Sequence, residues 1–202
     1  NLEKTVLVVQ ELEELDAYKL YNQKLNDLMF SEEFTKKVSF PDVPEMCKPL
    51  YNVIMFNKMF WLKDTVDKKY FDGDLIIWAD AGGLREPMEL YKGKVWPNID
   101  KINKIGDEKI IFFSHNEDFN VDDKEFLSLS QIRNIQGTAF FVPTNMVNYL
   151  TEEFCKTIDE SIDNKYIGSD EKVFDITYVR DKSKYHLVKC TWREYFKIFE
   201  NE

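Results

Sequence analysis

The sequence of 202 residues has no apolar run close to the roughly 20 residues that a membrane-spanning helix requires. It has only seven glycines and six prolines, and no Gly/Ser-rich or Pro-rich linker divides it. It also lacks the G-x-S-x-G, G-x-x-x-x-G-K-[S/T] and G-x-G-x-x-G motifs of α/β-hydrolases, P-loop proteins and dinucleotide-binding proteins. We therefore expect one domain over residues 1–202 and none of those three activities.

Cysteine is scarce, with three residues that stand far apart, Cys47, Cys155 and Cys190. Without a C-x-x-C pair, neither a zinc site nor a dithiol redox motif is indicated, and an odd number of cysteines does not suggest a disulfide framework. A reducing compartment such as the cytoplasm fits this use best. The chain opens on Asn1 rather than Met, so the numbered sequence can be an excised piece that lacks an upstream segment.

Basic residues are outnumbered by acidic ones, 27 against 37, and the net charge is −10. An acidic surface argues against nucleic acid and against an anionic membrane as partners, since both bind clustered Lys and Arg. Aromatic side chains, in contrast, are abundant, with 16 Phe, 10 Tyr and 4 Trp. Disordered chains lack this much large apolar surface, so the composition predicts a folded domain with a sizeable core.

Short apolar runs alternate with amphipathic stretches along the chain, which is typical of an α/β fold with a mostly parallel sheet. The expected strands are Thr5–Val9, Leu75–Ala79, Lys109–Ser114, Thr138–Val142 and Tyr185–Val188. The expected helices are Leu12–Met29, Pro49–Val66, one that begins at Thr144 and a short one that Ser169 caps. Because Leu75–Ala79 is apolar at every position, we expect both faces of this strand to be covered.

A carboxylate and two glycines follow the expected strand Leu75–Ala79, in the order Asp80-Ala81-Gly82-Gly83. In open α/β sheets ligands bind beyond the carboxyl ends of strands, and a carboxylate there can hold Mg²⁺ or Mn²⁺ through its oxygens. The glycines would let a ligand or another backbone come close. The alternative is that Asp80 only begins a turn, as Asp often does after a strand.

Lys58 lies on an apolar stripe of its expected helix, with Ile54, Trp61 and Leu62 as its neighbours one turn away. An unpaired charge in such a place is costly. The amine therefore either extends to water along the surface or meets a fixed anion, such as a carboxylate or a phosphate.

Two acidic residues, Asp170 and Glu171, open the last expected helix. Acidic side chains favour the positive end of a helix, so ordinary capping explains them; alternatively, one of them is a general base aimed into a cleft. The two histidines are less informative. His115 is expected in a surface loop, and His186 as a packed residue, unless a metal ion at Asp80 makes it a reasonable Mn²⁺ ligand.

Several segments have the order and spacing of one known family. Tyr51 precedes Lys58 by seven residues, and the later motifs are Ile77-Trp78-Ala79-Asp80-Ala81-Gly82, Gly137-Thr138-Ala139-Phe140-Phe141, Gly168-Ser169-Asp170-Glu171 and Trp192-Arg193-Glu194-Tyr195-Phe196. In these motifs the chain resembles the HtrL/YibB family, also called WlaTC-type glycosyltransferases. The resemblance implies a GT-A-like fold with a mixed, mostly parallel sheet flanked by helices. It also implies a nucleotide-sugar donor, most simply a UDP-sugar, and a divalent ion, Mn²⁺ or Mg²⁺.

The resemblance further implies roles for single residues. Asp80 takes the place of the last acid of a D-x-D metal motif, with His186 as a further metal ligand, whereas Trp78 stands where the first acid would be. Asp170 is the expected base for the acceptor hydroxyl, and Glu171 is the second candidate. The residues expected around the donor are Lys58, Asp80, Gly82, Arg85, Gly137 and Thr138.

The expected activity is metal-assisted transfer of a sugar, with inversion, from a nucleotide sugar to a hydroxyl of a glycan or protein-linked acceptor. The first alternative is a catalytically silent domain that binds a nucleotide sugar or a glycan. The second is an acidic interaction domain without a small-molecule site, which predicts that Lys58, Asp80 and Asp170 lie apart and solvated. The third is a metal-dependent hydrolase that releases free sugar from the donor.

Overall fold

The computed structural model describes residues 5–38, 40–83, 92–93, 97–105, 108–120, 134–191 and 194. Its strands are β1 (Leu75–Ala79), β2 (Ile110–Ser114), β3 (Ile135–Pro143) and β4 (Tyr185–Lys189). Its α-helices are α1 (Asp16–Met29), α2 (Glu32–Lys37), α3 (Pro44–Cys47), α4 (Pro49–Asp67), α5 (Ile99–Asn103), α7 (Val147–Asp163) and α8 (Asp170–Arg180). Short 3-10 turns are η2 (Leu12–Glu14), η4 (Thr144–Met146) and η5 (Lys182–Lys184). Among the helices described, none has the length and apolar character to span a bilayer.

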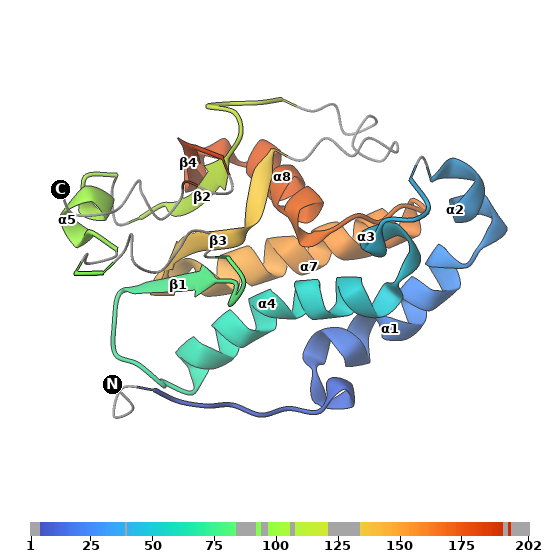
Figure 1. Ribbon diagram of the computed structural model, residues 1–202, viewed down its shortest axis with the longest axis horizontal. Coiled ribbons are helices and arrows are strands. Elements are labelled where there is room, and N and C mark those ends of the chain that lie inside the picture. Colours follow the sequence, from blue (N-terminus) through green and yellow to red (C-terminus); the bar gives the residue numbers. More distant parts are fainter. Residues whose placement is uncertain are drawn as a thin grey trace.

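The four strands form one mixed sheet in the order β1-β3-β2-β4 (Figure 1). β3 is antiparallel to both β1 and β2, and β2 is parallel to β4. The α/β class and the mixed sheet flanked by helices are therefore confirmed. The expectation that most strands are parallel is wrong for the strands described, because two of the three pairs are antiparallel. Apolar runs show that a strand is buried but say nothing of its direction, which depends on how its connections run.

Alternating side chains of the strands separate two apolar clusters on opposite faces of the sheet. On one face, Phe112 and Phe140 pack with the buried side chains of α1, α4, α7 and α8. The ring of Phe174 from α8 lies 5.1 Å from that of Phe140, so this helix is held directly on β3. On the other face, Phe113 and Phe141 form a smaller cluster with Ile102 of α5.

The edge strand β1 has the bounds that the sequence predicts, but its covering differs from the prediction. Ile76 and Trp78 pack against the larger cluster and Leu75 and Ile77 against the smaller one, but all four are only half-buried and Ala79 is exposed, so the two faces are covered only in part. The reason is position: β1 lies at one end of the described sheet, where no further strand shields it.

Two other expectations about the elements need correction. Thr5–Val9 is not a strand of the described sheet but an extended, exposed segment that leads into η2 and α1. Ser169 is the residue before α8 as expected, yet its side chain makes no capping hydrogen bond. Strand propensity does not supply a partner strand, which explains the first difference.

A buried carboxylate joins α8 to the start of β3. Asp175 is 0% exposed, and it accepts hydrogen bonds from the backbone N–H groups of Ile135 at 2.7 Å and Asn134 at 3.0 Å. Burial raises the pKa of Asp175 from 3.8 to about 7, while these N–H donors limit the rise. The bonds hold the beginning of β3 in place against the helix.

We expect Asp175 to make the chain less stable as the pH rises from about 4 to about 7. Its carboxyl keeps a proton to higher pH in the folded chain than in the unfolded chain, so folding takes up protons in this range and stability falls as they are lost. Urea unfolding across the range measures the effect. Asp175→Asn should flatten the dependence, at a cost of about 1–3 kcal/mol, because the amide nitrogen that replaces one carboxylate oxygen is a donor and cannot accept an N–H group. An unchanged slope would contradict the assignment.

Candidate functional site

The candidate site lies at the carboxyl end of β1, where four parts of the chain meet. Because β1 and β3 are antiparallel, the end of β1 lies beside the beginning of β3. The N–H of Asp80 donates to the carbonyl of Thr138 at 2.8 Å, which continues the pairing one residue beyond β1. The start of α8 and the middle of α4 complete the site.

The amine of Lys58, on α4, is at the centre of this site. Its Nζ donates to Asp170 Oδ2 at 2.8 Å and to the carbonyl of Gly137 at 2.9 Å, and it lies 3.3 Å from Asp80 Oδ1. An ammonium has three hydrogens, and the protein provides these three acceptors. The side chain is 3% exposed, so of the two alternatives for Lys58 the structure shows the fixed anion and not the extension to water.

The positive charge of Lys58 and the negative charges of Asp80 and Asp170 stabilise one another. Burial lowers the pKa of Lys58, but the carboxylates of Asp170 and Asp80 raise it by more, so the amine stays protonated at neutral pH. The two carboxylates differ in access: the side chain of Asp170 is 4% exposed and that of Asp80 is 31% exposed. Asp80 is therefore the one that a ligand reaches from solvent.

Gly137 lets the start of α8 approach β3 closely. A Cβ atom at this residue would lie 2.5 Å from Asp170 Oδ2, which is too short for any real contact. The N–H of Gly137 donates to Glu171 Oε1 at 3.2 Å, while its carbonyl accepts from Lys58. Any side chain here would push Asp170 away from the amine.

Two hydroxyl groups beside the cluster are buried and have no hydrogen-bond partner in the part of the chain that the structure describes, Thr138 Oγ1 and Ser169 Oγ. Thr138 follows Gly137, and Ser169 precedes Asp170. Buried polar groups are nearly always hydrogen-bonded, so an enclosed water molecule is the expected partner of each of these hydroxyls.

Trp78 is a part of the site for which the sequence provides no role other than a missing acid. Its Nε1 donates to Asp80 Oδ1 at 2.8 Å, and Lys58 Nζ lies 5.6 Å from its ring centroid. The ring stacks on Trp61 of α4, with centroids 5.9 Å apart and planes at 1°. Trp78 stands where the first acid of a D-x-D motif would be, and its indole N–H orients the carboxylate of Asp80.

Tyr51 is a second residue to which sequence reasoning gave no role. It lies two turns before Lys58 on α4 and is 37% exposed. Burial raises the pKa of Tyr51, and the charges of Asp170 and then Glu171 raise it further, so the phenol is near both acids. The signal was present in the seven-residue spacing, which places both side chains on one face of a helix.

The other predicted residues are not all brought to this place. Gly82 lies in the turn directly after Asp80, and Arg85 lies outside the described residues. His186 is on β4 opposite Ile111 of β2, so the width of β3 and β2 separates it from β1. Residue 111 belongs to the small cluster, so His186 is also on the opposite face from Trp78 and Asp80.

The described side chains do not fit a divalent metal ion well. Asp80 Oδ1 is already engaged by Trp78 and Lys58, and His186 is too far removed to join it. Within the described residues, no group of three or more His, Cys, Asp and Glu side chains is arranged to hold a metal. Lys58 is the cation that these carboxylates hold.

The fold and the site define a mixed α/β protein with a buried Lys–Asp–Asp cluster at the end of an edge strand. Residues 1–201 match the family described as "Bacterial protein of unknown function (HtrL_YibB)", so the chain belongs to the HtrL/YibB family. No curated protein and no solved structure matches it. Membership of the family is thus confirmed, and the family description assigns no activity.

We expect the Lys58–Asp170 pair to be strongly coupled because removal of one charge leaves the other buried. Lys58→Met should cost about 3–5 kcal/mol, and Lys58→Met with Asp170→Asn should cost much less than the sum of the two single changes. Lys24–Asp159 is the matched control: it has the same 2.8 Å distance, but its side chains are half-exposed. Its coupling should stay below about 1 kcal/mol. Equal coupling in both urea-unfolding cycles would contradict this account.

We expect Gly137→Ala to destabilise the chain by about 1–3 kcal/mol, since the new methyl group must displace Asp170 from Lys58. Gly82→Ala is the control, because a Cβ there has nothing within 4 Å, and it should change stability by less than about 0.5 kcal/mol. Thermal unfolding of both variants measures this. A neutral Gly137→Ala would show that Asp170 is held less firmly than the distances indicate.

Proposed function

We propose that the chain is a glycosyltransferase that moves a sugar from a nucleotide-sugar donor, first to be tested as a UDP-sugar, to a hydroxyl of a glycan or protein-linked acceptor. The observation that carries the proposal is the meeting of Lys58, Asp80 and Asp170 at the carboxyl end of β1. Buried ion pairs add little stability over apolar side chains of similar size. A buried charged cluster at a strand end is therefore better explained by function.

The reaction class comes from the motif resemblance alone, since the description of the family assigns no activity, and a GT-A-like arrangement belongs to the same proposal. The interaction-domain alternative predicts that Lys58, Asp80 and Asp170 lie apart and solvated. The three residues instead meet, and two of them are almost fully buried. A small-molecule site is the better explanation.

Access separates the roles of the two carboxylates. The side chain of Asp80 is 31% exposed and within reach of an acceptor hydroxyl or the donor, whereas that of Asp170 is 4% exposed. We assign contact with the ligand to Asp80, and to Asp170 the positioning of Lys58. The role of Asp170 as general base remains the competing version of the proposal and requires the acceptor to reach a side chain that is 4% exposed.

In the transfer, the acceptor oxygen bonds to the anomeric carbon as the bond to the diphosphate oxygen breaks, with inversion. The proton of the acceptor passes to the carboxylate that contacts it, which is Asp80 in the preferred version. The ammonium of Lys58, 3.3 Å from Asp80 Oδ1, holds this carboxylate in position. No step is assigned to Mn²⁺ or Mg²⁺, because the described residues do not provide its ligands.

The second candidate is a domain that binds a nucleotide sugar or glycan without turnover. Two observations favour it: Asp80 Oδ1 is held by both Trp78 and Lys58, and Trp78 stands in place of an acid. It predicts the same donor binding and no release of product.

Calorimetric titration with UDP and GDP, each with Mn²⁺ and with a chelator, tests the proposal. We expect UDP to bind in both conditions. Asp80→Asn should change the affinity for UDP by less than about tenfold, which corresponds to about 1.4 kcal/mol, because no metal ion links this carboxylate to the anionic diphosphate. Asp159→Asn, a change of the same kind in a surface ion pair, should leave binding unchanged. Absence of binding by either nucleotide would overturn the proposal. Binding that requires Mn²⁺ would overturn the conclusion that the described side chains do not fit a divalent metal ion.

Turnover separates the two candidates and the two carboxylates. Donor binding without sugar transfer to any acceptor tested would favour the silent domain. If transfer occurs, Asp170→Asn should reduce kcat only partly, whereas Asp80→Asn should abolish transfer. A complete loss of kcat in Asp170→Asn, with donor binding intact, would assign the base to Asp170.

A further inference from the structure

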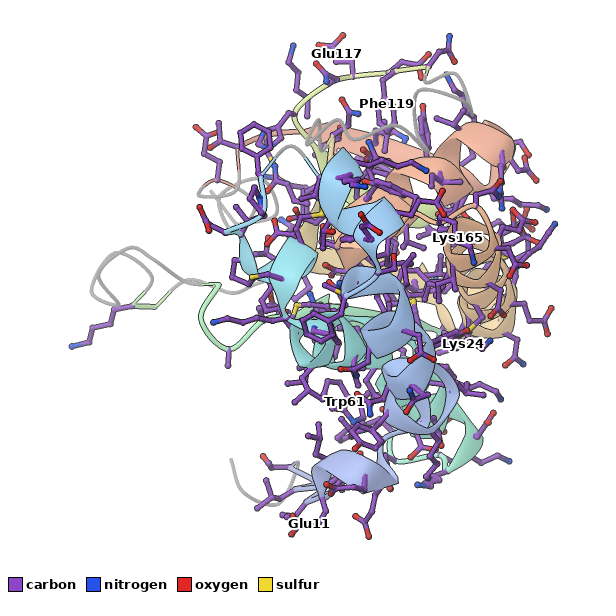
Figure 2. The ribbon with its side chains drawn as sticks, turned by 90° about the vertical axis from the view of Figure 1, so that its right-hand side faces the viewer. Glu11, Lys24, Trp61, Glu117, Phe119 and Lys165 are labelled. Carbon is purple, nitrogen blue, oxygen red and sulfur yellow. The ribbon has the colours of Figure 1, made fainter. Side chains whose placement is uncertain are left out.

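The outer edge of β1 borders a groove. In the part of the chain that the structure describes, β1 pairs with β3 on one side and with no strand on the other (Figure 1). A groove of about 890 Å³ follows it, with Leu75–Ala79 on one wall and Trp61 and Leu62 of α4 among the residues of the other. Sites for small ligands have volumes of about 300–1,000 Å³. In Figure 2, Trp61 lies well apart from Glu117 and Phe119, so this described part of the loop after β2 does not cover the groove.

The pairing with β3 determines which backbone groups of β1 point to the outer edge. The N–H of Asp80 donates to the carbonyl of Thr138 at 2.8 Å, just beyond one end of β1. The N–H of Thr144 donates to the carbonyl of Asp74 at 2.9 Å, just before its other end. Every second residue of an antiparallel strand is hydrogen-bonded to a given neighbour. The backbone N–H and C=O groups that point away from β3, toward the outer edge, are therefore those of Leu75, Ile77 and Ala79.

The lining of the groove suits an extended peptide. Its described side chains include one base and one acid, Lys69 and Asp72, and most of the others are apolar. A donor diphosphate binds where cations gather, so the groove fits an uncharged part of another substrate better. An alkyl chain or a glycan does not match the backbone groups at the outer edge, whereas a peptide provides N–H and C=O groups at the spacing of a strand.

A peptide paired with this edge would bring one of its residues beside Asp80. Trp78 and Asp80 point to the face of the sheet that α4 covers. In an antiparallel arrangement, Asp80 and the opposite peptide residue form a pair without mutual hydrogen bonds, in which the Cα atoms are about 4.5 Å apart. Their side chains lie on the same face, so a hydroxyl on the peptide residue is within reach of the Asp80 carboxylate.

We propose that the outer edge of β1 binds the acceptor as an extended, antiparallel peptide segment whose Ser or Thr hydroxyl lies at Asp80. The inference rests on the proposed function and narrows its acceptor to a peptide. Toward the carboxyl end of the peptide, the second and fourth residues after the hydroxyl residue lie opposite Trp78 and Ile76. Both of these side chains pack on the larger apolar cluster, so the peptide should carry apolar residues at its two matching positions.

Titration of the 202-residue chain with a synthetic peptide, followed by NMR, tests the pairing. The probe is acetyl-Ser-Gln-Val-Gln-Val-Gln-amide, with one N-methyl group either on the residue opposite Ile77 or on the residue opposite Trp78. The first methyl group removes a donor to β1 and should weaken binding at least about tenfold, whereas the second points away from β1 and should weaken it less than about threefold. Equal effects of the two methyl groups, or no binding of the unmethylated peptide at millimolar concentration, would overturn the proposal.

Replacement of the peptide Ser by Ala separates this inference from the proposed function. The Ala peptide should bind within about twofold of the Ser peptide but accept no sugar, because only the hydroxyl at Asp80 is lost. Binding of UDP without strand pairing of the peptide would overturn the inference and leave the proposed function with a glycan acceptor. Strand pairing in a chain that binds neither UDP nor GDP would overturn the role of the peptide as acceptor together with the proposed function.

Discussion

The buried ammonium of Lys58 requires three oxygen acceptors, and this requirement determines the local structure around the site. Lys58 reaches a carbonyl at the start of β3, a carboxylate at the start of α8 and a carboxylate after β1, so its position requires all three elements to be in place. Gly137 follows from the same requirement, because its missing side chain is what lets Asp170 come near. Helix, sheet edge and helix start are therefore held together by a single side chain that extends from α4.

Asp175 complements this arrangement from the next turn of α8. Asp170 holds the start of the helix through Lys58, and Asp175, five residues later, holds the start of β3 through two backbone N–H groups. Both carboxylates are almost without solvent contact. α8 is thus attached to β3 by polar bonds at its first turns and by Phe174 between them, which fixes the position of the hydroxyls of Thr138 and Ser169.

The local structure is largely predictable from the sequence, and the tertiary arrangement is not. The bounds of β1, the start of α4 at Pro49 and the buried stripe of α7 follow from runs and spacings within single elements. The direction of β3 and the exposure of Thr5–Val9 depend on which elements become neighbours, and local patterns do not contain that information. The same limit explains His186, which is a plausible metal ligand by chemistry but lies across the sheet from Asp80.

The candidate site shows the same division. The unusual burial of Lys58 could be inferred from its apolar stripe, but its partners Asp80 and Asp170 could be selected only through the resemblance to a family. Trp78 was interpreted as the loss of an acid, and only the geometry shows an indole that donates to the remaining one. Its parallel stack on Trp61 has an optical consequence: two indoles 5.9 Å apart couple their electronic transitions. The binding of a ligand to Asp80 can therefore be followed without a label. A ligand that draws the carboxylate away from Trp78 changes the near-ultraviolet circular dichroism of the two indoles.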